Sequence, residues 1–280
     1  MKPIRIAFLL VSIMLLQSCG LKFWYNRLDW VVSWQADDYV ELSSEQEDRL
    51  EALVREKLQW HRTTQLPRYV TLIKQLESEI GTEKIAENYD YYQSTLIDFY
   101  RTAAKELVPE VVAQMSDLDD EQVQELMQNI NDTANKRLQK YKKTKPAKRT
   151  KNSRESVTDG VEEWTGRLSK NQKALIKQWI TEMQSTSELR FNYGNQWRVA
   201  MDYALAERKT SEGQKKMIQL MLNPGELQSP ELQSRYAYNK ELEKSYILQL
   251  HQSMTKKQKK KLLRKLKSYR EDFQDLIEDD

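Results

Sequence analysis

The sequence predicts an all-α protein, and three observations lead to this fold class. Glycine and proline are scarce, with 7 and 6 residues in a chain of 280, so the chain has few residues for tight turns. A phrase typical of helix starts occurs four times. Apolar residues recur at intervals of three and four, and no segment alternates with the period of two that a half-buried strand needs. We therefore expect an elongated bundle of about seven to nine helices, preceded by a cleaved N-terminal segment.

Residues 1–18 have the features of a secretory signal peptide. Two positive charges precede an apolar run at residues 6–16, which is shorter than the roughly 20 residues that cross a bilayer. The letters LQSC at residues 16–19 then resemble the bacterial lipobox, in which a small residue stands before an obligatory cysteine. Cys19 is the only cysteine, so it has no partner for an internal disulfide. We predict cleavage before Cys19 and a lipoprotein held on a membrane by palmitate-type acyl chains on this thiol.

The lipid on Cys19 also implies a location. By resemblance to other bacterial lipoproteins, the presence of Gly20 where inner-membrane proteins carry aspartate implies the outer membrane, with the protein facing the periplasm. The mature chain is close to neutral once Lys2 and Arg5 are removed. We expect it to meet the membrane and an envelope protein or an anionic glycan, and we expect no nucleic-acid partner.

The mature chain divides into four regions. We expect a lipidated aromatic-rich lead at 19–41, an N-terminal helical region at 42–141, a basic linker or helix end at 142–156, and a C-terminal helical region at 157–280. The aromatic residues of the lead either dock it on the helical body or sit at the membrane interface. Two prolines interrupt helical stripes: we predict a kink or break near residues 63–67, at Pro67, and the end of a helix at Pro109.

Four phrases mark the expected helix starts: LSSEQ at 42–46, LDDEQ at 118–122, LSKNQ at 168–172 and MTKKQ at 254–258. Each places Ser, Thr or Asp three residues before Gln, which is the spacing of a capping box. In this motif the first side chain accepts a hydrogen bond from a free backbone N–H, and glutamine reaches back to the cap. The predicted pairs are Ser43 with Gln46, Asp119 with Gln122, Ser169 with Gln172, and Thr255 with Gln258. Their uneven spacing argues against a solenoid of equal repeats.

One cluster of polar and aromatic residues is dense enough to be a site. Its members are Asp29, Asp38, Trp60, His61, Arg62, Gln65 and Tyr69. In a functional interpretation, Arg62 pairs with an anionic group and His61 exchanges a hydrogen bond with it. In a structural interpretation, Arg62 forms an ion pair with Asp29 or Asp38 and fixes the lead on the first helix. We favour the structural interpretation, because helical proteins often lock a lead segment in this way.

The same N-terminal region resembles a bacterial lipoprotein family known only as a domain of unknown function. The resemblance rests on the motifs YN-x-LDW at 25–30, DDYV-x-L at 37–42 and WHR-x-TQLP-x-Y at 60–69. This resemblance implies that the chain has relatives in that family, but it implies no activity. A weaker resemblance links the four capping phrases to the periplasmic stress chaperones marked by L-T-x-x-Q, which are small all-helical proteins that use the phrase at helix starts.

These observations predict a protein that is not an enzyme. Two histidines and one cysteine leave no cluster for metal chemistry, and no Gly-rich phosphate loop is present, so we expect no metal, no cofactor and no catalytic residue. We expect a lipid-anchored periplasmic binding or scaffold protein, a class that includes chaperone-like proteins. One alternative is an envelope hydrolase that uses His61 with nearby carboxylates. The other is an anionic glycan or lipid binder that acts through the basic segments 136–154 and 256–270.

Overall fold

A computed structural model describes residues 19–279, and every element in this part of the chain is helical. The all-α prediction is confirmed, although the described residues form more helices than the expected seven to nine. The predicted signal peptide, residues 1–18, lies outside the described residues. The elements are α2 (Cys19–Tyr25), α3 (Leu28–Asp37), α4 (Ser44–Trp60), the π-helical turn η2 (His61–Gln65), α5 (Leu66–Glu79), α6 (Lys84–Glu87), α7 (Tyr89–Ser116), α8 (Asp120–Lys143), α9 (Pro146–Thr165), α10 (Lys170–Glu182), α11 (Ser187–Ala206), α12 (Ser211–Leu222), α13 (Pro230–Gln252) and α14 (Lys256–Glu278).

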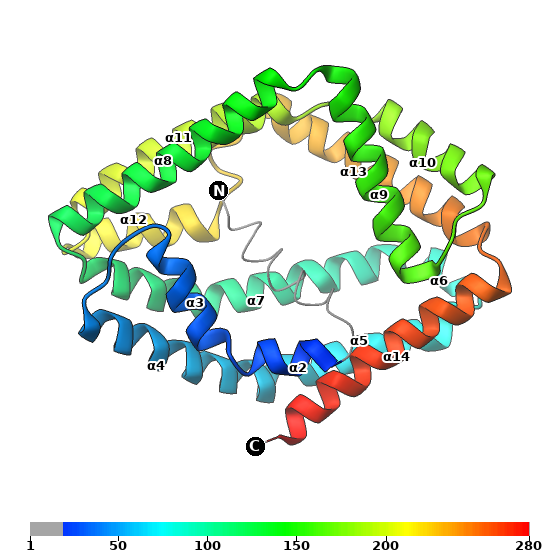
Figure 1. Cartoon of the computed structure of the whole chain (residues 1–280), viewed down its shortest axis with the longest axis horizontal. Coiled ribbons are helices and arrows are strands. Elements are labelled where there is room, and N and C mark those ends of the chain that lie inside the picture. The colour runs from blue at the N-terminus through cyan, green and yellow to red at the C-terminus, as the bar shows by residue number, and fades with distance from the viewer. Residues whose placement is uncertain (1–18, 280) are drawn as a thin grey trace.

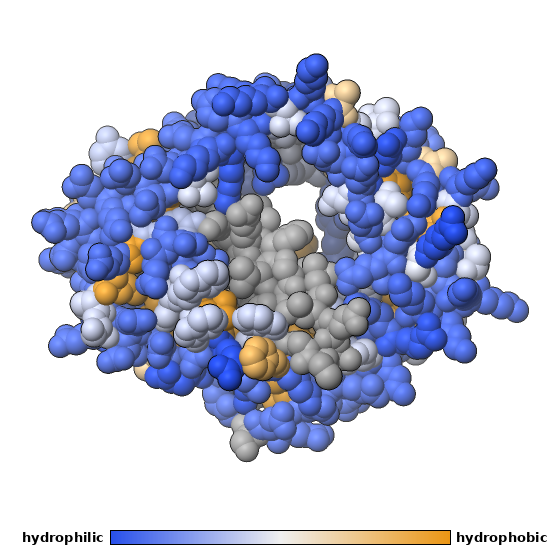
Figure 2. Space-filling model, viewed as in Figure 1, coloured by the Kyte–Doolittle hydropathy of each residue, from blue (hydrophilic) through white to orange (hydrophobic). Residues whose placement is uncertain are grey.

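The helices form an open ring where the sequence predicts an elongated bundle (Figure 1). One half of the ring contains α4, α7, α8, α11 and α12, and the other half contains α9, α10 and α13. Contact between α5 and α14 closes the ring. Figure 2 shows an opening that passes through the molecule.

Among the described residues, the buried apolar side chains form four clusters at junctions of helices in place of one central core, and the ring stays open. The first cluster, around Leu66 and Leu276, joins α2, α5 and α14. The second, around Met201 and Met217, joins α7, α8, α11 and α12. Two smaller clusters join α5 to α7 and α10 to α13. A helical stripe in the sequence shows which face is buried but not which partner buries it, so the prediction of a single bundle does not follow from the stripes.

Each of the four capping phrases starts a helix, and both bonds of each capping box are present. The four glutamines also meet in pairs. The amide of Gln46 donates to the Oε1 of Gln122 over 3.0 Å and accepts in return over 2.6 Å. Gln172 and Gln258 exchange the same two bonds over 3.1 and 3.0 Å. The caps therefore join the start of α4 to that of α8, and the start of α10 to that of α14.

The basic stretch at 142–156 is mostly helical. α8 ends at Lys143, and α9 begins at Pro146 after only two residues. Arg149 fixes this corner: its guanidinium donates to the carbonyl of Thr144 over 2.6 Å and to that of Tyr141 over 3.1 Å, and it lies over the Tyr141 ring. Proline is tolerated in the first turn of a helix because its missing N–H would have no partner there. The segment therefore forms a corner of the ring.

The two interrupting prolines have different effects. Pro67 lies at the start of α5, directly after the π-helical turn η2, so the helix changes its hydrogen-bond register within the predicted region. Pro109 does not end its helix, because α7 continues to Ser116. Pro109 is exposed, and so is Lys105, whose carbonyl loses its helical donor. Water can satisfy that carbonyl, which explains why the expected helix end is wrong.

Candidate functional site

The π-helical turn η2 sets the geometry of the predicted cluster. Proline removes one N–H donor and clashes with the carbonyl four residues before it, here that of Thr63. The wider turn relieves this clash, and the Leu66 N–H bonds the carbonyl of His61. The hydroxyl of Thr64 donates a hydrogen bond to the carbonyl of Trp60 over 2.6 Å. His61 is thereby directed toward α2, while Gln65 is buried beneath the turn.

His61 lies between two tyrosines. Its Nδ1 is 2.9 Å from the Tyr25 hydroxyl, and its Nε2 is 3.3 Å from the Tyr69 hydroxyl. Removal from water disfavours the charged imidazolium, so burial lowers the pKa of His61 to about 4. Burial also raises the pKa of Tyr69 to about 12. In a hydrolytic triad a histidine contacts a nucleophile and an orienting carboxylate, whereas here both ring nitrogens face neutral phenols.

Arg62 attaches the N-terminal lead and the end of the chain to this turn. Its guanidinium donates to the side-chain oxygen of Asn26 and, over 3.0 Å, to the backbone carbonyl of Asp279. It also lies 5.4 Å from the centre of the Tyr25 ring. The partners expected from the sequence are different ones: Asp29 faces Arg55 across 3.4 Å. Arg62 therefore holds the lead through the Asn26 side chain and the Tyr25 ring, and it holds residue Asp279 through a backbone carbonyl.

The remaining members of the cluster make contacts in different places, and not all of them lie near His61. Asp38 accepts from Gln35 within its own helix end and does not join His61. The amide oxygen of Gln65 accepts from Arg68 over 3.0 Å. The Tyr69 ring packs against Phe99 and Phe273, with centroids 4.6 and 5.9 Å away. The cluster thus lies where α2, α5, α7 and α14 meet, a position suited to holding the ring closed.

The buried His61 gives a testable pH dependence. Its folded-state pKa lies below the ordinary value of 6.5, so its contribution to stability is present above pH 6.5 and is lost as the pH falls through about 4. We expect the free energy of unfolding, measured with urea, to fall between pH 7.5 and pH 4. After solvent screening, this fall should be larger in the wild type than in His61→Phe by about 2 kcal/mol. An equal fall in unfolding free energy in the two proteins would contradict the burial of His61 as the source of this pH dependence.

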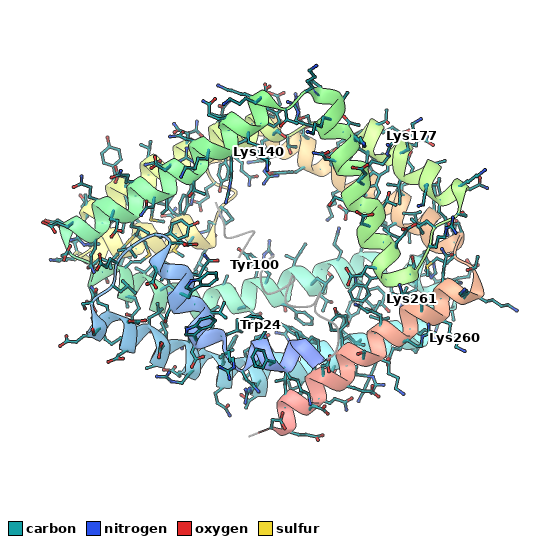
Figure 3. The ribbon with its side chains drawn as sticks, viewed as in Figure 1. Trp24, Tyr100, Lys140, Lys177, Lys260 and Lys261 are labelled. Carbon is teal, nitrogen blue, oxygen red and sulfur yellow. The ribbon has the colours of Figure 1, made fainter. Side chains whose placement is uncertain are left out.

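A second surface lines the opening of the ring. The sequence singles out one half of it, the basic segment 136–154, but not the apolar residues that face this segment. Figure 3 shows Tyr100 of α7 and Lys140 of α8 at opposite edges of the opening. Leu96 and Ile97 precede Tyr100 by one helical turn and share its side of α7. Their exposed fractions are 59 % for Leu96, 42 % for Ile97 and 42 % for Tyr100. The sequence places Leu96 in an apolar stripe that is typical of a core position, yet it is exposed.

The facing wall is a basic face of α8. It borders a hollow of about 630 Å³, lined by Asp132, Asn135, Lys136, Gln139, Lys140, Lys143 and Thr144. The three lysines are spaced by four and three residues and so share one face of the helix. Within residues 19–279 none of them forms an ion pair. We name the exposed α7 residues and the three α8 lysines together the inner surface.

The comparisons with known proteins give one finding. A family model described as a family of unknown function matches residues 38–233. No curated protein and no solved structure matches the chain. The match extends far beyond the N-terminal region in which the sequence motifs lie, and it contains α4 to α12, including both α7 and α8. It begins after the first motif, at 25–30.

Proposed function

The chain belongs to that family, DUF6279, and we propose that it is a lipid-anchored periplasmic binding protein that holds extended or unfolded segments of envelope proteins. In this proposal acyl chains on Cys19 keep it on the outer membrane, and the helical ring supplies the binding surface. The observation that carries the proposal is the inner surface, where exposed apolar side chains stand across the opening from unpaired lysines.

The chemistry of the inner surface suits an unfolded polypeptide. The exposed apolar surface of Leu96, Ile97 and Tyr100 can be covered by the apolar side chains that an unfolded client exposes. An exposed apolar patch on a folded protein often marks a binding site. Lys136, Lys140 and Lys143 add long, unpaired cations that attract acidic residues. Binding of this kind favours a class of client over a single ligand.

The lipid tether adds to this function. Attachment confines the ring to a thin layer at the membrane, which raises its effective concentration toward partners in the same layer. Exported outer-membrane proteins pass through that layer before they fold. Weak binding at the inner surface is therefore sufficient to keep a useful fraction of the protein occupied by clients. The large apolar cavity that high affinity would require is not needed.

An aggregation assay tests the proposal. The mature protein without residues 1–18, at stoichiometric ratio, should suppress the aggregation of a chemically denatured model protein. The double variant Leu96→Ser/Tyr100→Ser should need roughly tenfold more protein for the same suppression, because it removes the apolar wall. The matched control is Val199→Ser/Tyr203→Ser on α11, which replaces two exposed residues at the same spacing. No suppression by wild type, or equal losses in both variants, would count against the proposal.

A second candidate function rests on the unpaired lysines alone. An anionic glycan or lipid headgroup would contact Lys136, Lys140 and Lys143 without using α7. Replacing these lysines with glutamine would then abolish binding of purified lipopolysaccharide, whereas Leu96→Ser/Tyr100→Ser would leave it intact. The contacts of His61 with two tyrosines lend no support to the hydrolase alternative.

A further inference from the structure

The lead segment exposes four large aromatic side chains within twelve residues. They are Phe23, Trp24, Trp30 and Trp34, and we name them the aromatic face. Trp30 and Trp34 have exposed fractions of 57 % and 58 %. Their rings stack nearly parallel, with centroids 6.2 Å apart. Figure 2 shows pale and orange side chains over α2 and α3 in a surface that is otherwise mostly blue. Exposed tryptophans in such a group need an explanation, because aromatic side chains usually serve burial.

The opposite side of the same segment is firmly docked. Leu21, Tyr25 and Leu28 are buried in the first apolar cluster. The hydroxyl of Tyr25 bonds His61, and the side chain of Asn26 bonds Arg62. The two sequence-based alternatives for the lead therefore apply to different residues: these docked side chains fix it to the body, and the aromatic face is left outside. A fixed segment presents its exposed rings as a rigid surface.

We propose that the aromatic face is a bilayer-contact surface that lies in the headgroup region of the membrane carrying the lipid anchor. This inference rests on the lipid tether proposed above. α2 begins at Cys19, so the predicted acyl chains enter the membrane one helical turn before Phe23. Tryptophan is favoured at the boundary between headgroups and acyl chains because its ring is apolar and its N–H is polar. Arg27, whose guanidinium lies 4.8 Å from the centre of the Phe23 ring, is placed to meet lipid phosphates.

The position of the aromatic face sets the orientation of the ring on the membrane. α2 and α3 lie on the broad side of the ring that faces the viewer in Figure 1. Contact of the aromatic face with the bilayer therefore turns this broad side toward the membrane. A protein held by acyl chains alone would be free to tumble on its tether, whereas two attachments fix its orientation. The inner surface would then open toward the layer in which membrane proteins are inserted.

Quenching by brominated lipids tests the proposal on the acylated protein. The protein is purified from membranes and placed in phosphatidylethanolamine–phosphatidylglycerol vesicles whose acyl chains carry bromine near the headgroup end. Mass spectrometry of the same sample establishes whether Cys19 is acylated. Tryptophan emission of the wild type should be quenched, and Trp30→Phe/Trp34→Phe should reduce the quenched fraction about twofold. The control Trp164→Phe/Trp179→Phe, which removes two indoles of the helical body, should keep the quenched fraction at or above that of the wild type.

The outcomes separate this proposal from the tether on which it rests. A sample without acyl chains would refute the tether itself. An acylated sample whose emission is not quenched, or is quenched equally in Trp30→Phe/Trp34→Phe, would overturn the bilayer-contact surface and leave the tether standing. Dimers in detergent that dissociate in the same double variant, together with unquenched emission, would assign the aromatic face to a second copy of the chain and would also overturn the proposal.

Discussion

Replacement of Gly213 by alanine is expected to destabilise the protein by about 3 kcal/mol or more. Alanine normally stabilises a helix relative to glycine. Whether this substitution stabilises or destabilises the protein therefore depends on the space available for the added methyl group. A Cβ atom on Gly213 would lie 2.2 Å from the backbone oxygen of Glu207 and 2.5 Å from its carbonyl carbon. Both are backbone atoms, which cannot turn away as the end of a flexible side chain can. The connection from α11 to α12 must therefore shift.

That connection contributes to one corner of the ring. Arg208, next to Glu207, is buried and donates to the carbonyl of Leu118 over 2.8 Å and to Asp120 over 2.6 Å. A shift at Glu207 strains these bonds and thus loosens the start of α8. Gly160, in the interior of α9, provides the control because no atom beyond its own helix backbone lies within 4 Å of the place that a Cβ atom would take. Gly160→Ala should stabilise by about 0.5–1 kcal/mol. Urea unfolding of both variants checks the difference, and a stable Gly213→Ala would contradict it.

Replacement of Gln172 by leucine is expected to cost about 3 kcal/mol. The Gln172 side chain is 2 % exposed, and it bonds the Ser169 N–H, the Ser253 carbonyl and the Gln258 amide. Leucine has a similar volume, so the cost comes from the buried polar groups that lose their partners. Each such group costs roughly 1–3 kcal/mol, because it has no water to replace the lost bond.

The other glutamine pair provides a matched comparison. Gln46 has the same place in its capping box and the same reciprocal bonds with Gln122, but both side chains are only half-buried. Water can satisfy the groups that Gln46→Leu leaves behind, so this variant should cost about 1 kcal/mol. Unfolding free energies of the two variants measure the difference. Equal costs would show that burial of the Gln172–Gln258 pair is not what gives the pair its strength.

The features that the sequence predicts well are those that depend on neighbouring residues. The capping boxes need only side chains three residues apart, and all four are present. The pairing of their glutamines joins residues 76 and 86 positions apart, which no local spacing encodes. The open ring has the same origin: a stripe such as that containing Leu96 and Phe99 indicates an apolar face, and only the tertiary arrangement decides which of its residues another helix covers.

The candidate site shows the same division. The sequence groups His61, Arg62 and Tyr69 correctly on one helical stretch, because they are close along the chain. It misses that Tyr25 and Asn26 are the partners of that stretch, since an amide or a phenol carries no charge that would single it out beside Asp29 and Asp38. The sequence includes the lysines of α8 in the basic segment 136–154 and proposes only an anionic glycan or lipid as its partner. Their spacing of four and three residues was the available signal that they share one face.

If clients bind at the inner surface of the ring, site-specific photocrosslinking should attach a defined client to that surface. A photoreactive side chain replaces Lys140, at the edge of the opening, or Lys177 of α10, in the otherwise unchanged mature protein (Figure 3). Each is irradiated with a permanently unfolded, acidic model protein such as reduced and carboxymethylated lactalbumin. We expect a strong adduct at position 140 that excess unlabelled client removes, and little adduct at position 177. Equal adducts at both positions, or an adduct at 177 alone, would contradict it.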